Sequence, residues 1–129
     1  MAEIISISLN KEMIEQMNVI QKEMNFSGRS EIVRAGLRNL IEEYNSLHAL
    51  SGIVEGTLIV THKEEYNDEF SKIKHTAPHD CVKTHLHHEL SNHLCMEVLL
   101  FRGDSKNLQE LYKKFTSSRK IESVKVVVY

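Results

Sequence analysis

Residues 4–9 read Ile-Ile-Ser-Ile-Ser-Leu, and this short stretch decides the fold of the first half of the chain. The side chains alternate in the period-two pattern of a β-strand. One face would carry Ile5, Ile7 and Leu9, and the other Ile4, Ser6 and Ser8. The segment that follows contains no second strand, so we expect this strand to pair with its counterpart in another copy of the chain.

Two amphipathic helices are predicted after the strand. Asn10 is a good cap for the first, on which methionines and Ile20 recur at helical spacing. Residues 25–28 supply a break, and Ser30 is expected to cap the second helix, with Glu31 at its positive end. The apolar positions of the second helix are Val33, Leu37, Leu40, Ile41 and Tyr44.

One strand and two helices bury too little apolar surface to be stable alone, so dimerisation into a ribbon-helix-helix module is predicted. Such a ribbon can enter the major groove of DNA, where Ile4, Ser6 and Ser8 would face the bases. Arg29 and Ser30 would lie at a phosphate, at the start of the second helix. A dimerisation module without DNA binding is the alternative, because residues 1–44 hold more acidic than basic side chains.

The second half is predicted to follow a strand-helix-strand-strand-helix-strand order after a junction at Ser51 and Gly52. The expected strands cover residues 53–62, 80–87, 94–102 and 121–129, and the helices 64–76 and 104–118, with Asp104 as a cap. This is the ferredoxin-like βαββαβ pattern. The chain is therefore expected to be α+β, with one domain at 1–48 and another at 52–129.

Six of the eight histidines fall between His75 and His93. His85 and His87 would project from one face of a strand, and Cys95 can face them from the next strand. His75, at the end of the preceding helix, can add a fourth donor. Imidazoles and a thiolate suit Ni(II), Cu(II), Co(II) or Zn(II); a planar arrangement would favour nickel or copper, and a tetrahedron zinc.

The other side chains near the cluster receive weaker assignments. Glu97 is expected to accept a hydrogen bond from a ligand histidine and fix its tautomer. His79 and Cys81 share the parity of His85 on the predicted strand, and His88 points to the opposite face. His93 is placed in the second shell or on the hairpin surface, and His62 on the surface. His48 lies near the linker and receives no role. The competing interpretation makes the histidines solvated and Cys95 a core thiol.

Several classes of protein are disfavoured by what the sequence lacks. It contains no HExxH motif and no Ser/His/Asp order, so an enzyme is not expected. No apolar run approaches the roughly 20 residues of a membrane span. The N-terminus has no signal-peptide pattern, and two cysteines suit a reducing compartment. A cytoplasmic protein without membrane contact is therefore predicted.

The motifs of both halves resemble those of the nickel-responsive regulator family, NikR, whose C-terminal domain is ACT-like. The resemblance covers nearly the whole chain and rests on ISISLN, GRSEIVRAGLR, GTLIVTHK, HLH at 85–87 and HLCMEVLLFRGD at 93–104. It implies a homotetramer, a dimer of dimers that binds operator DNA when loaded with one Ni(II) per subunit. It also implies square-planar nickel held by His85, His87 and Cys95 of one subunit and His75 of its neighbour.

The chain departs from the family pattern at several positions. The loop between HLH and Cys95 is about two residues longer, so His88 or His93 can take the place of a ligand. Ile4 stands where an arginine is common, and Ala35 replaces an acidic residue. The leading hypothesis is a nickel-responsive transcriptional regulator. The alternatives are a paralogue that senses copper, cobalt or zinc, a metal-binding protein with weakened DNA recognition, and a regulator with an organic effector.

Overall fold

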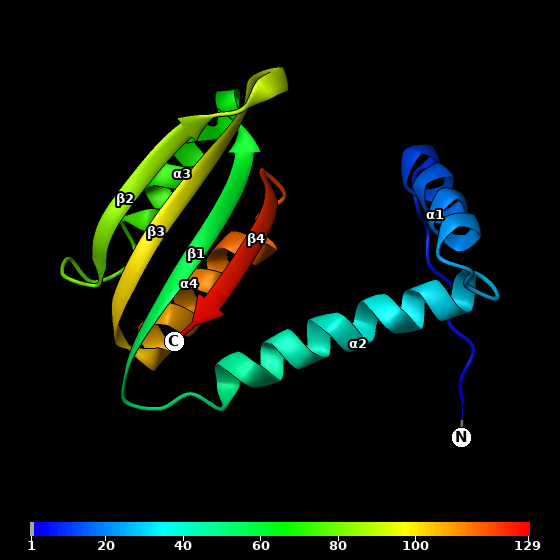
Figure 1. Cartoon of the computed structure of the whole chain (residues 1–129), viewed down its shortest axis with the longest axis horizontal. Coiled ribbons are helices and arrows are strands. Elements are labelled where there is room, and N and C mark those ends of the chain that lie inside the picture. Colours follow the sequence, from blue (N-terminus) through cyan, green and yellow to red (C-terminus); the bar gives the residue numbers. More distant parts are fainter. Residues whose placement is uncertain (1) are drawn as a thin grey trace. The chain divides into compact units, whose positions relative to one another are not determined.

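The computed structural model describes residues 2–129, which form two compact units, the first ending at Asn45 and the second being Ser46–Tyr129. The first unit holds α1 (Lys11–Glu23) and most of α2 (Arg29–His48) (Figure 1). The Asn10 side chain accepts a hydrogen bond from the Met13 amide at 2.8 Å, which confirms the predicted cap. Within residues 2–129 no helix has the length and apolar character needed to cross a membrane.

The start of α2 differs from the prediction. The helix already includes Arg29, and the Ile32 amide donates to the Gly28 carbonyl at 3.4 Å. Ser30 therefore lies inside the first turn, and its assignment as the helix cap is wrong. The break before α2 falls where expected, with Asn25 in the left-handed region at a φ of 56°.

The first unit has no core of its own. No side chain among residues 2–45 is buried, and Met13, Leu37, Leu40 and Ile41 are about half exposed. Residues 2–9 form no strand ladder within the single chain, because a ladder needs a partner. Pairing of this segment with a second copy remains a prediction.

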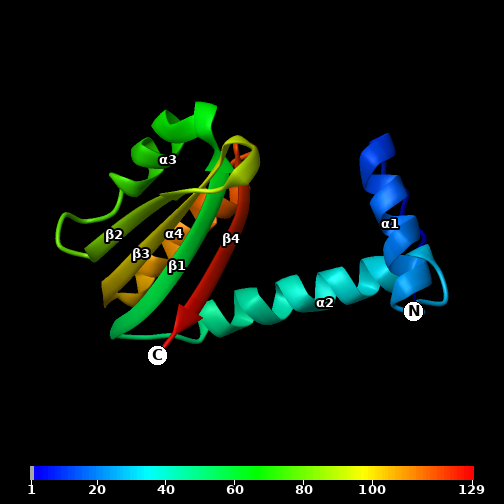
Figure 2. The same cartoon turned by 45° about the horizontal axis from the view of Figure 1, so that its top comes forward.

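The second unit is a four-stranded antiparallel sheet in the order β2-β3-β1-β4. Its strands are β1 (Ile53–Lys63), β2 (Val82–Glu89), β3 (Leu94–Asp104) and β4 (Ile121–Val128). The helices α3 (Asn67–Lys74) and α4 (Ser105–Ser117) lie on one face of the sheet in both views (Figures 1 and 2). The predicted ferredoxin-like order is confirmed.

The core lies between this sheet face and the helices. Leu58, Leu99, Leu108 and Phe115 are fully buried there, and Phe70 of α3 stacks on Phe115. The predicted cap of α4 is confirmed, since Asp104 accepts from the Lys106 amide at 2.8 Å. The helix predicted over 64–76 divides into a 3-10 turn (Glu64–Tyr66) and α3, and β2 begins and ends two residues later than expected.

Candidate metal centre

The candidate side chains lie in rows across the helix-covered face of the sheet. In the register of β2, β3 and β1, Cys95 is flanked by Glu89 and His62, and these three residues form what we call the Cys95 row. Glu97 is flanked by His87 and Val60, and Leu99 by His85 and Leu58. His87 is therefore one row from Cys95, and His85 is two rows away.

Glu97 connects two of the predicted ligand histidines. Its side chain is almost fully buried, and its carboxylate accepts hydrogen bonds from Nε2 of His85 at 3.0 Å and from Nδ1 of His87. The strand period explains the arrangement, because His85 and His87 project from the same side of β2 as Glu97 does from β3. The structure thus brings Glu97 and both histidines of the HLH motif together.

His87 and His75 each have one ring nitrogen prepared to bind a cation. A carboxylate accepts and does not donate, so Nδ1 of His87 carries a proton, and in the neutral ring the lone pair is on Nε2. His75 follows α3, and its Nδ1 lies 2.6 Å from the Ser71 carbonyl oxygen. The same reasoning leaves the lone pair of His75 on Nε2, which is the form in which imidazole binds metals.

His85 is held differently, because both of its ring nitrogens are engaged. Nε2 donates to Glu97, and the Lys74 ammonium lies 3.0 Å from Nδ1. An ammonium can only donate, so it occupies the lone pair of Nδ1. His85 would have to give up one of these two contacts before it could bind a metal ion.

His62 is buried, and its predicted surface position is wrong. Its ring has no exposed area and stacks on Phe70 with centroids 5.3 Å apart. Nδ1 donates to the Lys63 carbonyl at 2.8 Å, and Nε2 finds no hydrogen-bond partner among the described residues. Nε2 lies 3.8 Å from Glu97. The period-two pattern of β1 already indicated that His62 is buried, since it shares a strand face with Leu58 and Val60.

Cys95 is a buried thiol in negatively charged surroundings. Desolvation by burial raises the pKa of Cys95 above its ordinary 9.0, and the charges of Glu64, Glu97 and Glu89 raise it further, in that order. The thiolate is the form that binds metals. A cation at this sulfur would therefore have to displace a proton, and the nearby carboxylates would attract the cation.

Cys81 and His79 precede β2, so neither lies on that strand as predicted, although Cys81 does face the helix-covered core. The strand begins at Val82, and its register shifts between Val82 and Thr84. Cys81 is buried in the turn before it, far along the sheet from Cys95, and its sulfur accepts a weak hydrogen bond from Asn107.

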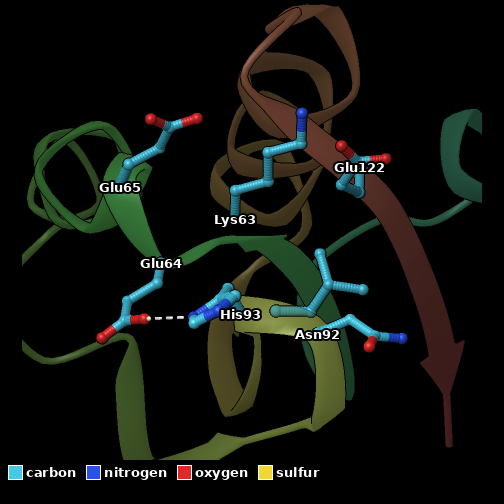
Figure 3. Close-up of a pocket in the computed structure, with 7 residues that line it drawn as sticks. Lys63, Glu64, Glu65, Asn92, His93 and Glu122 are labelled. Carbon is cyan, nitrogen blue, oxygen red and sulfur yellow. Dashed lines mark hydrogen bonds and ion pairs between the residues drawn. The ribbon is translucent and has the colours of Figure 1, made fainter.

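The two remaining histidines of the cluster lie away from Glu97. His88 pairs with Met96 in the register, which places it on the uncovered sheet face, as its parity predicts. His93 lies in the hairpin between β2 and β3 at a φ of 60°, and its Nδ1 is 3.4 Å from Glu64 (Figure 3). Both carboxylate and ring are exposed at the rim of a surface pocket.

The donors of a single chain do not converge. Within residues 2–129 no group of three histidine, cysteine or acidic side chains is arranged to hold a metal ion. The donor chemistry nevertheless fits a borderline cation, because a thiol and imidazole lone pairs lie within neighbouring rows. A complete coordination sphere thus requires a side-chain movement or a ligand from a second copy.

The predicted DNA-contacting residues are accessible. Ile4 is fully exposed, and Ser6, Ser8 and Ser30 are exposed as well. Arg29 is also exposed, and its guanidinium donates to the Asn18 side chain at 3.3 Å.

Comparisons with known proteins agree with both halves of this description. The NikR C terminal nickel binding domain matches residues 56–129, and the ribbon-helix-helix protein of the copG family matches residues 3–44. An uncharacterized protein from Thermotoga maritima has a similar fold, with a TM-score of 0.53 at 11% identity, over 60% of this chain and 98% of that one. That likeness supports the fold alone.

Two archaeal relatives are similar over nearly the whole chain. A putative nickel-responsive regulator of Methanococcus vannielii is 33% identical over 127 residues, which cover 96% of this chain and 89% of the relative. Another, of Methanocaldococcus jannaschii, is 30% identical over 126 residues, with the same coverage of both chains. With its ribbon-helix-helix and nickel-binding domains in this order, the chain belongs to the nickel-responsive regulator family.

Proposed function

We propose that the chain is a cytoplasmic transcriptional regulator that binds operator DNA when loaded with a metal ion, with Ni(II) as the first candidate. The observation that carries this proposal is the buried Glu97 carboxylate, which fixes the tautomer of His87 one row from Cys95. A carboxylate behind a ligand imidazole is the usual support of a protein metal site. The relatives named as putative nickel-responsive regulators favour nickel and a regulatory role without catalysis.

The candidate ligands are those predicted from the sequence: His75, His85, His87 and Cys95. Lone pairs on Nε2 of His87 and His75 support their inclusion, whereas His85 enters the set only if it leaves Lys74. Since one chain does not assemble three donors, we place His75 in a second copy. When bound, the ion would link two copies and so favour one disposition of their DNA-binding units.

Two apolar surfaces support a dimer of dimers. The first unit has no buried side chain among its described residues, so its helices need a partner to gain a core. The uncovered face of the sheet exposes Leu86, Leu100 and Val127 by 61%, 42% and 50%. One surface would pair the ribbon-helix-helix units, and the other would pair the sheets.

The DNA contacts of this proposal come from the N-terminal segment. Paired strands would place Ile4, Ser6 and Ser8 toward the bases, and the start of α2, with Arg29 and Ser30, would lie at a phosphate. Affinity would depend on these contacts more than on bulk charge, because residues 1–44 carry five basic and seven acidic side chains.

Titration of the metal-free full chain with Ni(II) tests the metal-binding half of the proposal. We expect a thiolate-to-nickel absorption band that disappears in Cys95→Ala and persists in Cys81→Ala, a matched loss of the other buried thiol. Binding of Ni(II) without that band, or its persistence in Cys95→Ala, would contradict the proposed centre. A selective response to zinc, copper or cobalt would support a paralogue for another ion.

A second candidate function is a metal-binding protein with weakened DNA recognition. It is favoured by the full exposure of Ile4, an apolar side chain that cannot make a bidentate contact to guanine, and by the acidic first half. If the protein binds metal ions but binds no DNA duplex at low salt, this second candidate is the correct one.

A further inference from the structure

We propose that Glu89 supplies a carboxylate ligand to the ion held by Cys95 and His87, in the position that the sequence motif alone assigns to His85. This inference rests on the proposed metal-binding function and names the donors that the ion meets. Glu89 ends β2 and is exposed, and the proposal requires its side chain to turn toward the sulfur.

The strand register places Glu89, and not His85, beside Cys95. Glu89 is the residue of β2 directly opposite Cys95, and His87 is the next residue of β2 on the same face. His85 is four residues from Glu89, which is about 13 Å along a strand. The His85 ring leans one row toward Cys95, because its Nε2 contacts Glu97, and this contact holds the ring in the row before that of Glu89 and Cys95. Metal–ligand bonds are only about 2.0–2.3 Å long, so one ion cannot bind donors at both positions 85 and 89.

The hydrogen bonds of the two imidazoles decide which of them can bind the ion. His87 has a lone pair on Nε2, because Glu97 holds the proton of Nδ1. His85 offers no lone pair, because Lys74 occupies Nδ1 and Glu97 holds the Nε2 proton. The two histidines of the HLH motif thus have different roles: His87 faces the ion, and His85 holds Glu97 in place.

The Cys95 row itself points to a cation. It contains a thiol, the Glu89 carboxylate and Nε2 of His62, a fully buried nitrogen that lacks a hydrogen-bond partner among residues 2–129 and lies 3.8 Å from Glu97. These groups donate electron pairs, and Glu97 in the next row adds another carboxylate. A bound cation would stabilise the buried donors of Cys95, His62 and Glu97, and the exposed Glu89 carboxylate would close the group from the solvent side.

A carboxylate changes which ion the site prefers. Exchange of an imidazole for an oxygen donor makes the set of ligands harder, and Zn(II) accepts mixed sulfur, nitrogen and oxygen ligands readily. We therefore expect a smaller preference for Ni(II) over Zn(II) than an imidazole at position 89 would give. The variant Glu89→His restores such an imidazole beside Cys95.

Three glutamine variants of the full chain test the assignment: Glu89→Gln, His85→Gln and Glu64→Gln. Glutamine is a poor ligand, but it can still donate to Glu97 from position 85. Glu64→Gln is the matched charge control, because Glu64 raises the pKa of Cys95 more than Glu89 does and lies instead against His93 (Figure 3). Affinities for Zn(II) and Ni(II) are measured by competition with a chromophoric chelator.

We expect Glu89→Gln to weaken metal binding by at least about tenfold, while the other two variants stay within about threefold of the unchanged chain. Glu89→His should raise the ratio of Ni(II) to Zn(II) affinity.

A loss of affinity in His85→Gln with none in Glu89→Gln would overturn the assignment and indicate that β2 moves two residues along β3. Equal losses in Glu89→Gln and Glu64→Gln would also overturn it, as an effect of charge alone. If the unchanged chain binds neither ion, the proposed function itself fails.

Discussion

Replacement of Glu97 by glutamine tests whether one buried carboxylate organises the candidate metal centre. Glutamine keeps the size of the side chain and one oxygen acceptor, but it removes the charge and the second acceptor. His85 and His87 both donate to this carboxylate, so one of the two bonds is lost and the other becomes uncharged. We expect weaker binding of the ion together with a moderate loss of stability.

The size of both effects follows from the contacts. A hydrogen bond to a charged group contributes about 1.5–3 kcal/mol, and solvent reduces this value for partly exposed partners. The side chains of His85 and His87 are 28% and 41% exposed, so a loss of about 1–2 kcal/mol in the free energy of unfolding is expected. Loss of the orienting acceptor should weaken metal binding by about 10- to 100-fold.

Urea denaturation of the metal-free protein, followed by circular dichroism at a fixed protein concentration, measures the first effect. Competition with a chromophoric chelator measures the second. Glu55→Gln is the control, because Glu55 pairs with Arg102 on the surface and should change stability by less than about 0.5 kcal/mol. If Glu97→Gln binds metal as tightly as the unchanged chain, the role assigned to Glu97 is refuted.

Three further predictions concern packing, capping and pH. A Cβ on Gly103 would lie 2.7 Å from Sγ of Cys81, so Gly103→Ala should destabilise the protein by about 1–3 kcal/mol. Addition of Cys81→Ala should recover part of that loss in denaturation experiments; no recovery would contradict the steric cause. Asn10→Ala should cost about 1 kcal/mol, and an unchanged urea midpoint would show that the cap contributes nothing. Because the pKa of Cys95 lies above 9.0, apparent metal affinity should rise about tenfold per pH unit between about pH 7 and 8.5, whereas a flat profile would exclude the thiol as a ligand.

The raised pKa of Cys95 also affects stability without metal. The unfolded thiol loses its proton at a lower pH than the folded one, so the folded state binds more protons within that interval. The free energy of unfolding should therefore fall as pH rises past 9.0, and Cys95→Ala should reduce the slope.

Much of the fold could be predicted because it depends on local patterns. Period-two runs gave β1, β3 and β4, and helical spacing with a polar cap gave α1 and α4. The start of α2 was less predictable, because Ser30 caps well in general but Gly28 already supplies the first carbonyl acceptor. Local preference cannot decide between two such neighbouring starts.

The candidate centre could be predicted only in part, because register depends on turn geometry. The HLH motif indicates a shared strand face, and the structure has that face, but the hairpin between Glu89 and Leu94 decides which residue lies opposite Cys95. The contact between Lys74 and His85 joins α3 to β2, and no local sequence pattern predicts it. The burial of His62 was visible in its parity with Val60, but a single histidine is usually on the surface.

Metal-dependent binding of DNA tests the central claim most directly. Duplexes selected from a random pool by the Ni(II)-loaded full chain would be labelled, and their affinity measured by fluorescence anisotropy with and without the ion. The account predicts that removal of the ion, or Cys95→Ala in its presence, weakens binding by about 5- to 150-fold, the usual range of coupling between two sites. Equal affinity for the selected duplex in all three states would contradict it.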